Sequence, residues 1–419
     1  MRIGIIGGGG AGLTAAWLLE EEHDVTLYER ATRLGGHAWT IPVEVAGQTF
    51  PMDVGFEFFS ANMFPTFERL LRRLDVPLRP YAASVTLYSR ERVRVLPPSR
   101  AGRLYWPGLG PRPLADLVRL VYLLRRADEL MRRRDTTVTL QAFVDSTPLL
   151  SQAFKEEFLY PFLLAQWCVE PAEFRQFMAY NALRYAYLHL RLSLQPPQML
   201  EPEGGMEAYI GRIERTLQRA RLQLSADVSH LTRTDQGWQV EMAGGGAQTH
   251  DALIIAANAR AGARLLADVA GQTETARQLG RIEFFPTTIA LHGDTRLMPA
   301  RRAHWSVVNT RFDGHYAQNT IWKAWRSRPE QPIFKSWVTF EPQLPEPLYR
   351  TVTFEHPKIN RAYFEAQAAL AALQGRDNLY LAGVHTQDVD CHESAIRSAV
   401  AAARRLSPRA ARLRWLEAG

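Results

Sequence analysis

The first chemistry that this sequence suggests is the binding of phosphate groups by three glycines close to Met1. Gly7, Gly9 and Gly12 stand in the spacing G-x-G-x-x-G. In that spacing the first glycine allows a tight turn, the second lets the backbone approach a pyrophosphate, and the third lets a helix pack on a strand. A helix that begins directly after the glycines would offer free N–H groups and a partial positive charge to the same phosphates.

Two predicted strands and one predicted helix position these glycines. Residues 2–6 form a short apolar run, residues 13–22 have a buried helical face, and residues 24–29 form a second strand that ends in Glu29. The Glu29 carboxylate can accept hydrogen bonds from both hydroxyls of a ribose, and it would repel the 2′-phosphate of NADP. The complete strand–turn–helix–strand unit therefore predicts a dinucleotide site rather than a glycine-rich turn without a ligand.

Length, charge and cysteine content limit the class of protein. A chain of 419 residues predicts two or three domains. The net charge of +7 permits anionic partners without demanding a nucleic acid. Cys168 and Cys391 lie too far apart in the sequence for a disulfide framework or a metal cluster, so we expect no metal and a reducing compartment. No apolar run reaches about 18 residues and no signal peptide is evident, so we expect a cytoplasmic protein.

The segment after Glu29 favours FAD over NAD. It places Arg33, Gly35 and Gly36 where an NAD dehydrogenase would normally begin its next helix. This glycine pair resembles the R-x-G-G segment of the flavin-containing amine oxidase and phytoene desaturase superfamily, which packs along the FAD pyrophosphate. His37 stands where that pattern usually continues with arginine.

Further segments extend the resemblance along the whole chain. Residues 50–59, "FPMDVGFEFF", are similar to the D-x-G stretch of the family, whose backbone passes close to the isoalloxazine. Residues 202–218 resemble a P-x-G-G helix entry, and residues 222–231 resemble the strand that holds the adenine, with Val228 at the matching position. Residues 251–259 read as a buried strand of the flavin domain.

The C-terminal segment resembles the closing FAD motif of the family. Residues 378–406 contain a strand, Gly383, a loop and a helix whose N-terminus would point at the flavin and ribitol. The closest likeness is to bacterial amine-oxidase-like proteins, which carry a "YEHP"-like segment, here residues 354–357, and an His-Glu pair before the last helix, here His392 and Glu393.

The departures from the family pattern bear on the reaction. Val384 follows Gly383, where many members have an acid that holds the ribitol. Amine oxidases have a glycine and an aromatic residue before the closing helix, and that aromatic forms half of a cage that favours an amine. Asp390 and Cys391 occupy those positions. We interpret this as a sign against a typical amine oxidase, and we predict that Asp390, Cys391 and His392 form the catalytic group.

The resemblance implies a fold and a division into domains. It predicts an α/β protein with a Rossmann-like FAD-binding domain of glutathione-reductase type and an inserted α+β substrate domain. The predicted FAD-binding domain consists of residues 1–60, 200–280 and 355–419. The predicted substrate domain consists of residues 61–199, which look mostly helical, and 281–354, which contain short aromatic-rich strands.

Cofactor-binding residues are predicted in every one of these motifs. The full set is Gly7, Gly9, Gly10, Ala11, Gly12, Glu29, Arg30, Arg33, Gly35, Gly36, His37, Asp53, Val54, Gly55, Phe56, Val228, Gly383, Val384, Glu393, Ser394 and Ala395.

Other candidates have two readings each. Amine oxidases use a lysine to hold a water against flavin N5, and Lys323 or Lys335 could match it. His385 is either a flavin contact or a loop histidine, and residues 164–171 either line the substrate cavity or belong to the core. Residues 112–135 form a basic amphipathic pattern that suits either an anionic membrane surface or, as we favour, an ordinary domain helix.

We therefore expect an FAD-dependent oxidoreductase that accepts a hydride from a hydrophobic or amphipathic small molecule, lipid-like molecules included, and forms or shifts a C–C double bond. One alternative is an amine oxidase that acts on a C–N bond. Another is an isomerase or a flavoprotein without net redox turnover. Neither a nucleic acid nor a membrane is a favoured partner, and oxygen, a quinone and a partner protein all remain open as the electron acceptor.

Overall fold

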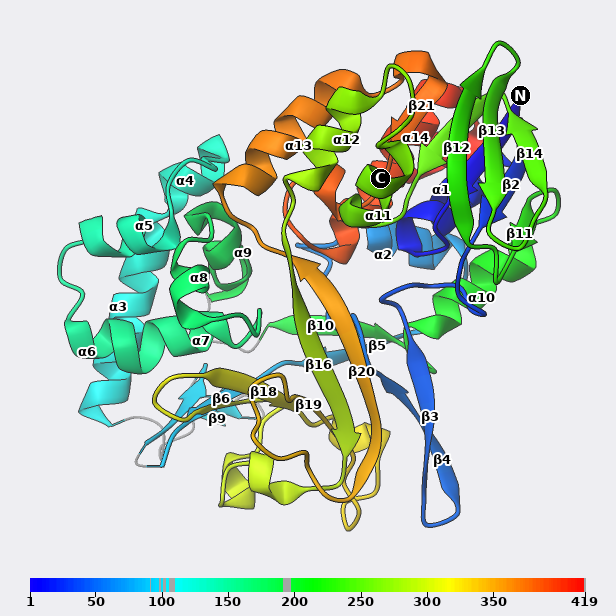
Figure 1. Ribbon diagram of the computed structural model, residues 1–419. Helices are drawn as coiled ribbons and strands as arrows, with labels where there is room; N and C mark the ends of the chain where they lie inside the picture. The colour runs from blue at the N-terminus through cyan, green and yellow to red at the C-terminus, as the bar shows by residue number, and fades with distance from the viewer. Residues whose placement is uncertain (91, 98, 101–102, 105–109, 191–196, 418–419) are drawn as a thin grey trace.

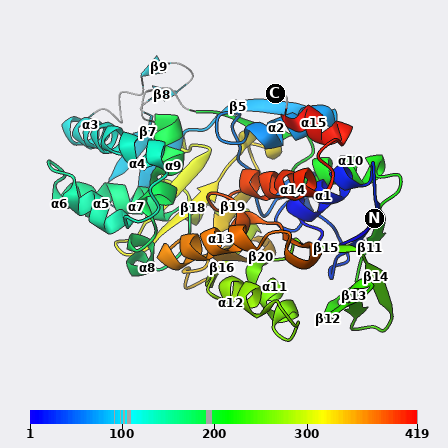
Figure 2. The same ribbon diagram turned by 90° about the horizontal axis from the view of Figure 1, so that it is seen from above.

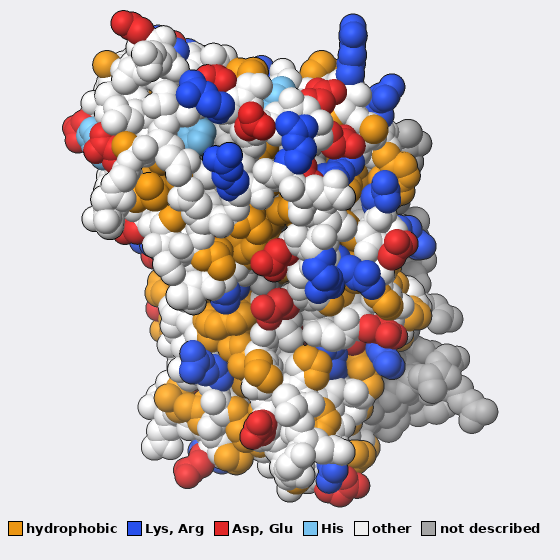
Figure 3. Space-filling view, turned by 90° about the vertical axis from the view of Figure 1, so that its right-hand side faces the viewer, with side chains coloured by type: hydrophobic (Ala, Val, Ile, Leu, Met, Phe, Trp, Pro, Cys, Tyr) orange, Lys and Arg blue, Asp and Glu red, His pale blue; other side chains and the backbone are white. Residues whose placement is uncertain are grey.

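The structure is a computed structural model that describes residues 1–417 except 91, 98, 101–102, 105–109 and 191–196 (Figure 1). A parallel sheet with helices on both faces lies at one end of the molecule, and a long antiparallel sheet lies at the other. A group of helices flanks the antiparallel sheet, as the view from above also shows (Figure 2). On the face drawn in Figure 3, acidic and basic side chains are interspersed.

The parallel sheet brings together strands from distant parts of the chain. Its order is β11-β2-β1-β15-β21, and every neighbouring pair is parallel. The strands are β1 (Arg2–Ile6), β2 (Asp24–Tyr28), β11 (Arg221–Gln223), β15 (Ala252–Ile255) and β21 (Leu379–Leu381). Because both faces of such a sheet are covered, β1 and β15 are almost continuous apolar runs rather than alternating ones. The predicted α/β class is confirmed.

The two faces of this sheet bury two different helix layers. Ile5, Leu27 and Ile254 point to the face that is covered by α1 (Gly10–Leu19), α2 (Pro65–Arg73), α10 (Glu207–Thr216), α14 (His392–Leu406) and α15 (Ala411–Glu417). Leu253, Ile255 and Leu381 point to the other face, where α11 (Ala259–Leu266), α12 (Thr273–Gly280) and α13 (Arg361–Leu373) pack. The first helix and the last long one thus share one layer.

The second sheet is antiparallel except for its parallel β17–β6 pair, and the smaller sheets are antiparallel. The seven-stranded sheet has the order β20-β16-β19-β18-β17-β6-β7. Its strands are β6 (Val85–Tyr88), β7 (Val93–Leu96), β16 (Phe284–His292), β17 (Val308–Phe312), β18 (Ala317–Ile321), β19 (Phe334–Trp337) and β20 (Leu348–Pro357). The smaller sheets pair β3 (Thr40–Val45) with β4 (Gln48–Asp53), β5 (Leu78–Ala82) with β10 (Gln198–Pro202), β8 (Ser99–Arg100) with β9 (Arg103–Leu104), and β12 (Val228–Thr234) with β13 (Gly237–Met242) and β14 (Ala247–His250).

A helical group lies between β9 and β10. It contains α3 (Pro111–Arg126), α4 (Asp128–Arg133), α5 (Leu140–Ser146), α6 (Gln152–Phe154), a π-helical turn (Lys155–Leu159), α7 (Tyr160–Leu164), α8 (Pro171–Arg175) and α9 (Ala179–Leu190). The basic pattern of residues 112–135 is two helices, α3 and α4, rather than one. Leu120 and Leu124 of α3 are buried in the core, as expected for a domain helix.

These positions support the proposed division of the chain without fixing its boundaries. All strands of the parallel sheet fall in the three segments assigned to the FAD-binding domain. The segment that was expected to be mostly helical supplies β6 and β7 to the seven-stranded sheet, and the boundary proposed at residue 355 falls inside β20. Among the described residues, no helix is long and apolar enough to cross a membrane.

Candidate functional site

The glycine loop connects β1 to α1 at the carboxyl end of the parallel sheet. A Cβ on Gly12 would lie 1.8 Å from the carbonyl oxygen of Gly7, so the helix can approach the strand only at glycine. Gly7 itself has a φ of 108°, which favours glycine. A Cβ on Gly9 would meet no atom within 4 Å. The loop therefore has open space above Gly9, beside the first N–H groups of α1 at Gly10 and Ala11.

The carboxylate of Glu29 lies beside this loop. Its Oε2 accepts a hydrogen bond from the Gly8 N–H at 2.7 Å, and its Oε1 accepts one from the Ala31 N–H at 2.8 Å. Both bonds fix the side chain at the end of β2, where a ribose would lie. Arg30 is exposed. The Ala226 N–H donates to the Glu29 carbonyl at 2.9 Å, so the chain that enters β12 at Val228 starts close to the same place.

The R-x-G-G segment packs against the glycine loop. The Gly35 N–H donates to the Gly8 carbonyl at 2.8 Å. Arg33 donates to the carbonyl of Gly36 at 2.8 Å, and its guanidinium lies 3.9 Å from the centre of the Trp39 ring. Gly36 and His37 are exposed. The segment thus faces the same open space as Gly9.

The D-x-G segment runs alongside His37. The Phe56 N–H donates to the His37 carbonyl at 2.9 Å. A Cβ on Gly55 would lie 1.9 Å from that carbonyl oxygen, so this contact requires glycine. The side chain of Asp53 faces away, and its Oδ1 accepts hydrogen bonds from the Thr40 hydroxyl at 2.6 Å and the Met206 N–H at 2.8 Å. Asp53 and its neighbour Val54 are buried, so only the backbone of this segment is offered to a ligand.

The two candidate lysines differ in what they contact. Lys335 donates to the Gly55 carbonyl at 2.6 Å and lies 2.7 Å from Glu57. Lys323 lies 2.8 Å from Glu57 and 2.8 Å from Glu201. Burial would raise the pKa of Glu57, but Lys323 and Lys335 hold it below its ordinary value. Lys335 is therefore the lysine that contacts the backbone of the D-x-G segment, which is predicted to pass the flavin.

The closing segment contributes backbone groups and one buried imidazole. The Gly383 N–H donates to the Ser398 hydroxyl at 2.7 Å, and the Val384 carbonyl accepts from the Tyr363 hydroxyl at 2.6 Å. His385 is 2% exposed, and its Nε2 has no hydrogen-bond partner among the described residues. Burial lowers the pKa of His385 to about 4, so the imidazole is neutral at pH 7.

The three predicted catalytic residues are consecutive but face different neighbours. An Asp390 carboxylate oxygen lies 3.8 Å from Nδ1 of His356. Cys391 precedes α14, its Sγ lies 3.5 Å from the Ser394 hydroxyl, and burial raises the pKa of the thiol to about 11. His392 is turned toward the glycine loop, with Nε2 2.8 Å from the Tyr209 hydroxyl. Burial lowers the pKa of His392 to about 3.

The residues that follow His392 divide between structure and cavity. Glu393 accepts hydrogen bonds from the N–H groups of Thr66 at 3.0 Å and Phe67 at 2.9 Å, so both its oxygens cap α2. Ser394 is buried and lines the cavity described below, while Ala395 is half-buried. Glu393 was predicted to bind the cofactor, and its carboxylate is thus hydrogen-bonded to the N-terminus of α2.

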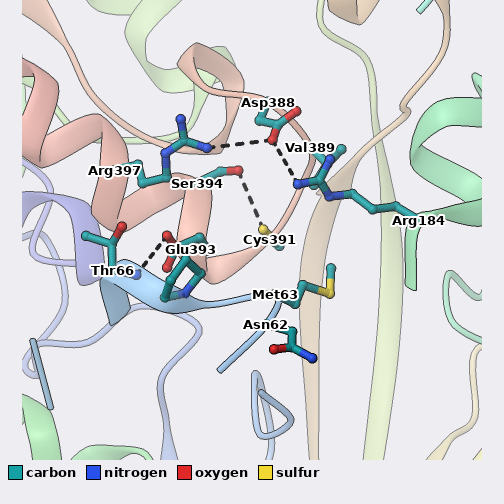
Figure 4. A pocket seen from close by; sticks show the side chains of 11 residues that line it. Asn62, Met63, Thr66, Arg184, Asp388, Val389, Cys391, Glu393, Ser394 and Arg397 are labelled. Atoms are coloured by element: carbon teal, nitrogen blue, oxygen red, sulfur yellow. Dashed lines mark hydrogen bonds and ion pairs between the residues drawn. The ribbon is translucent and has the colours of Figure 1, made fainter. Parts of the chain in front are cut away.

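A cavity of about 150 Å³ opens beside Cys391 and Ser394 (Figure 4). It lies between the turn before α2, the loop before α14, and α9. Its lining residues are Asn62, Met63, Pro65, Thr66, Arg184, Asp388, Val389, Cys391, Glu393, Ser394 and Arg397. His392 is not among them, because its ring packs on Phe56 at 4.6 Å on the other side of the helix start.

Several softer candidates lie in the core. Cys168 is 1% exposed, and its Sγ lies 3.2 Å from the Thr339 hydroxyl. Trp167 packs edge-on against Phe177 at 5.6 Å. A cavity wall and a core were equally expected for these residues, and the contacts favour the core.

Sequence reasoning missed His356 as a partner of Asp390, and it also missed Tyr209, Arg184 and Asp388. His356 stands in the "FEHP" segment, whose likeness to the family was a usable signal; its ring stacks on His37 at 5.2 Å. The other three are isolated residues of separate elements, and no spacing in the sequence relates them.

An adenine dinucleotide fits these residues on three observations. The glycine loop leaves open space above Gly9. Gly36 and His37 are exposed beside it. The closing segment holds a buried imidazole nitrogen of His385 without a partner among the described residues. The first and last helices of the layer, α1 and α14, meet at this place, since a Cβ on Gly10 would lie 2.7 Å from the His392 ring.

Comparison with known proteins identifies similar sequences and folds. The sequence model described as flavin containing amine oxidoreductase matches residues 11–301. Coproporphyrinogen III oxidase of Mycobacterium bovis (strain ATCC BAA-935 / AF2122/97) is 38% identical over 101 residues, which are 22% of this chain and 21% of that protein. This match thus spans about a fifth of the length of the curated relative.

Two solved structures share the fold over almost the whole chain. A CLA-producing fatty acid isomerase from P. acnes has a TM-score of 0.68 at 15% identity, covering 97% of this chain and 98% of its own. Cyclohexylamine oxidase from Brevibacterium oxydans IH-35A has a TM-score of 0.66 at 16% identity, covering 97% of this chain and 99% of its own. At these identities the likeness is one of fold.

Proposed function

The chain belongs to the flavin-containing amine oxidoreductase family and is an FAD-dependent oxidoreductase, and from this premise we propose that it oxidises a C–C bond. The substrate is a hydrophobic or amphipathic molecule, and the product carries a new or shifted double bond. The glycine loop, Glu29 and the backbone of residues 53–56 hold the cofactor, and bound FAD supplies the hydride acceptor.

The observation that carries this proposal is the wall of the cavity at Cys391. Amine oxidases of the family have an aromatic ring at this position, and a ring attracts the nitrogen of an amine. Here the position holds a small thiol that stays protonated, because burial raises its pKa to about 11. The guanidiniums of Arg184 and Arg397 line the same cavity and would repel an ammonium group. This wall suits an uncharged carbon chain better than an amine.

The pair of Asp390 and His356 supplies the proton acceptor. When a hydride leaves one carbon of the substrate, the neighbouring carbon loses a proton, and the electrons of that C–H bond form the double bond. The Asp390 carboxylate takes this proton, and Nδ1 of His356 lies 3.8 Å from one of its oxygens. The electrons then pass to oxygen, a quinone or a partner protein.

Oxidation of a C–N bond is the second candidate. It is favoured by the family match over residues 11–301 and by the shared fold of an amine oxidase. It requires an amine to bind next to two arginines, which is why we place it second.

Anaerobic titration of the purified holoprotein distinguishes the two. We expect acyl compounds to bleach the visible absorbance of the flavin and amines to leave it unchanged. Cys391→Tyr, which restores a ring, should slow bleaching by acyl compounds at least tenfold, about 1.4 kcal/mol in the barrier, whereas Cys168→Ala at the other free cysteine should not. Bleaching by amines alone, with peroxide release in air, would contradict the proposal.

A further inference from the structure

We propose that the cavity beside Cys391 binds a carboxylate group through Arg184 and Arg397. The inference rests on the proposed function, because it names the substrates as carboxylic acids with an apolar chain. The cavity, its two guanidiniums and the carboxylate that both share carry it (Figure 4).

The two guanidiniums have hydrogen-bonding capacity to spare. Arg184 of α9 and Arg397 of α14 approach the same oxygen, Oδ2 of Asp388, at 3.4 and 3.7 Å. These separations are longer than a good charge-assisted hydrogen bond of about 2.7–2.9 Å. The buried Nε of Arg184 has no hydrogen-bond partner among the described residues. Arg184 also donates to the Tyr180 hydroxyl, so the donors left for a second anion are its Nε and the N–H groups of Arg397.

The carboxylates already present do not balance the positive charge. Oδ1 of Asp388 accepts from Arg134 at 2.8 Å and from the Tyr180 hydroxyl at 2.9 Å, so one carboxylate serves three arginines. Glu393 lines the same cavity, but its two oxygens already accept hydrogen bonds from the backbone N–H groups at the start of α2. A ligand carboxylate would supply the missing negative charge.

The apolar residues of the cavity indicate what kind of chain the carboxylate ligand carries. Met63, Pro65 and Val389 add apolar surface to the cavity that the guanidiniums and Cys391 also line. A volume of about 150 Å³ accommodates a head group and a few carbons, not a large anion. A planar carboxylate also matches the planar donor fork of a guanidinium. The carboxylate end is held at the arginines, and the apolar chain leads past Cys391.

The test measures binding of a fatty acid to the holoprotein under anaerobic conditions, by calorimetry and by the shift of the flavin spectrum. Decanoate is the probe, and decanol and decylamine are the matched neutral and cationic compounds. We expect decanoate to bind at least tenfold more tightly than either. Arg184→Gln and Arg397→Gln should each weaken decanoate by about tenfold and leave decanol unchanged.

Arg134→Gln is the matched control, because Arg134 pairs with the same Asp388 but does not line the cavity. It should leave the affinity for decanoate unchanged. Equal losses in all three variants would mean that the arginines only hold the structure together, and this would overturn the proposal. So would equal affinity for decanoate and decanol, or displacement of decanoate by inorganic phosphate at the same concentration.

The experiment distinguishes a failure of the carboxylate site from a failure of the proposed oxidation. If decanoate binds as expected but no acyl compound bleaches the flavin, the carboxylate site stands and the proposed oxidation of a C–C bond is wrong. If acyl compounds bleach the flavin without regard to their charge, the oxidation stands and the carboxylate site is wrong.

Discussion

Single residues determine the polarity of the site. Cys391 is neutral because burial raises the pKa of its thiol to about 11, and His392 is neutral because burial lowers the pKa of its imidazole to about 3. Charge enters through Asp390 on one side, and on the other through the arginines and the carboxylates of Asp388 and Glu393. A neutral surface between two charged ends suits a substrate that is itself polar at one end.

Part of the acid stability of the protein depends on the buried imidazole of His385. Its pKa is about 4 in the folded chain and about 6.5 in the unfolded chain, because burial disfavours the charged form. As the pH falls below 6.5, the unfolded chain takes up the proton first, so the free energy of unfolding decreases. The decrease is about 1.4 kcal/mol per pH unit from this side chain down to pH about 4.

We therefore expect His385→Gln to destabilise the protein less at pH 4.5 than at pH 7, since glutamine does not titrate. Urea unfolding of both proteins across this range measures the difference. His315→Gln is the control, because His315 is exposed. A destabilisation by His385→Gln that stays constant with pH would show that the imidazole is not buried neutral.

Residue types with strict spacing could be predicted from the sequence, and residues that meet only in space could not. Gly7, Gly12 and Glu29 follow from one local unit, because a turn between a strand and a helix imposes its own requirements. Arg184 belongs to a helix and Asp388 to a loop, and the two residues are 204 positions apart in the sequence. Only the packing of the helical group against the closing segment brings them together.

At the scale of elements, α14 organises the site by its first turn. His392 contacts the glycine loop, Glu393 caps α2, and Ser394 lines the cavity. Three successive residues serve three neighbours because successive positions on a helix point in directions about 100° apart. The sequence predicted this helix and its pointing toward the flavin, but it did not predict that α2 depends on it.

Replacing Glu393 should destabilise α2. The residue before this helix, Phe64, offers no side-chain cap, so the Glu393 carboxylate is the cap of its first N–H groups. We expect Glu393→Ala to lower the free energy of unfolding by about 1–2 kcal/mol, and Glu393→Gln by less, since the amide oxygen still accepts. Urea unfolding measures both.

Glu365→Ala provides the comparison for this cap. Glu365 forms an ion pair with Arg281 in which both side chains are largely exposed. Such pairs contribute about 0–1 kcal/mol, so this variant should stay close to the wild type. If Glu393→Ala were no worse than Glu365→Ala, α2 would be stable without the carboxylate.

The prediction of elements failed where tertiary pairing overrode local pattern. The run "TIWKAW" alternates like a strand, but β18 ends at Ile321 and a short 3-10 turn follows. The reason lies in Lys323, whose side chain turns to the buried Glu57 and Glu201. Strands β6 and β7 were missed because they lie in a segment dominated by helical patterns. They join the sheet only through the pairing of β6 with β17, far along the chain.

At the scale of the whole molecule, buried charges join the parallel-sheet end to the seven-stranded sheet. Glu57 follows the D-x-G segment, and Lys335 belongs to β19. Their charged atoms lie 2.7 Å apart with 5% and 2% of the side chains exposed. A buried charge without its partner is costly, so the pair fixes the position of the D-x-G backbone relative to the second sheet.

A double-mutant cycle tests this coupling. We expect Lys335→Met to lower the free energy of unfolding by about 3 kcal/mol, because Glu57 loses one of its two cations. Adding Glu57→Gln removes the unbalanced charge and leaves Lys323 with Glu201 at 2.8 Å. The double variant should therefore be more stable than Lys335→Met alone, with a coupling energy of about 1–3 kcal/mol by urea unfolding.

The matched control is the exposed ion pair between Arg260 of α11 and Glu355 of β20, which also joins the two ends of the molecule. Arg260→Met, Glu355→Gln and their combination should be additive within about 0.5 kcal/mol. Additive effects at Lys335 and Glu57 as well would mean that the two sheets are held by apolar packing alone. In that case the position of the Gly55 carbonyl, to which Lys335 donates at 2.6 Å, would not depend on the ion pair.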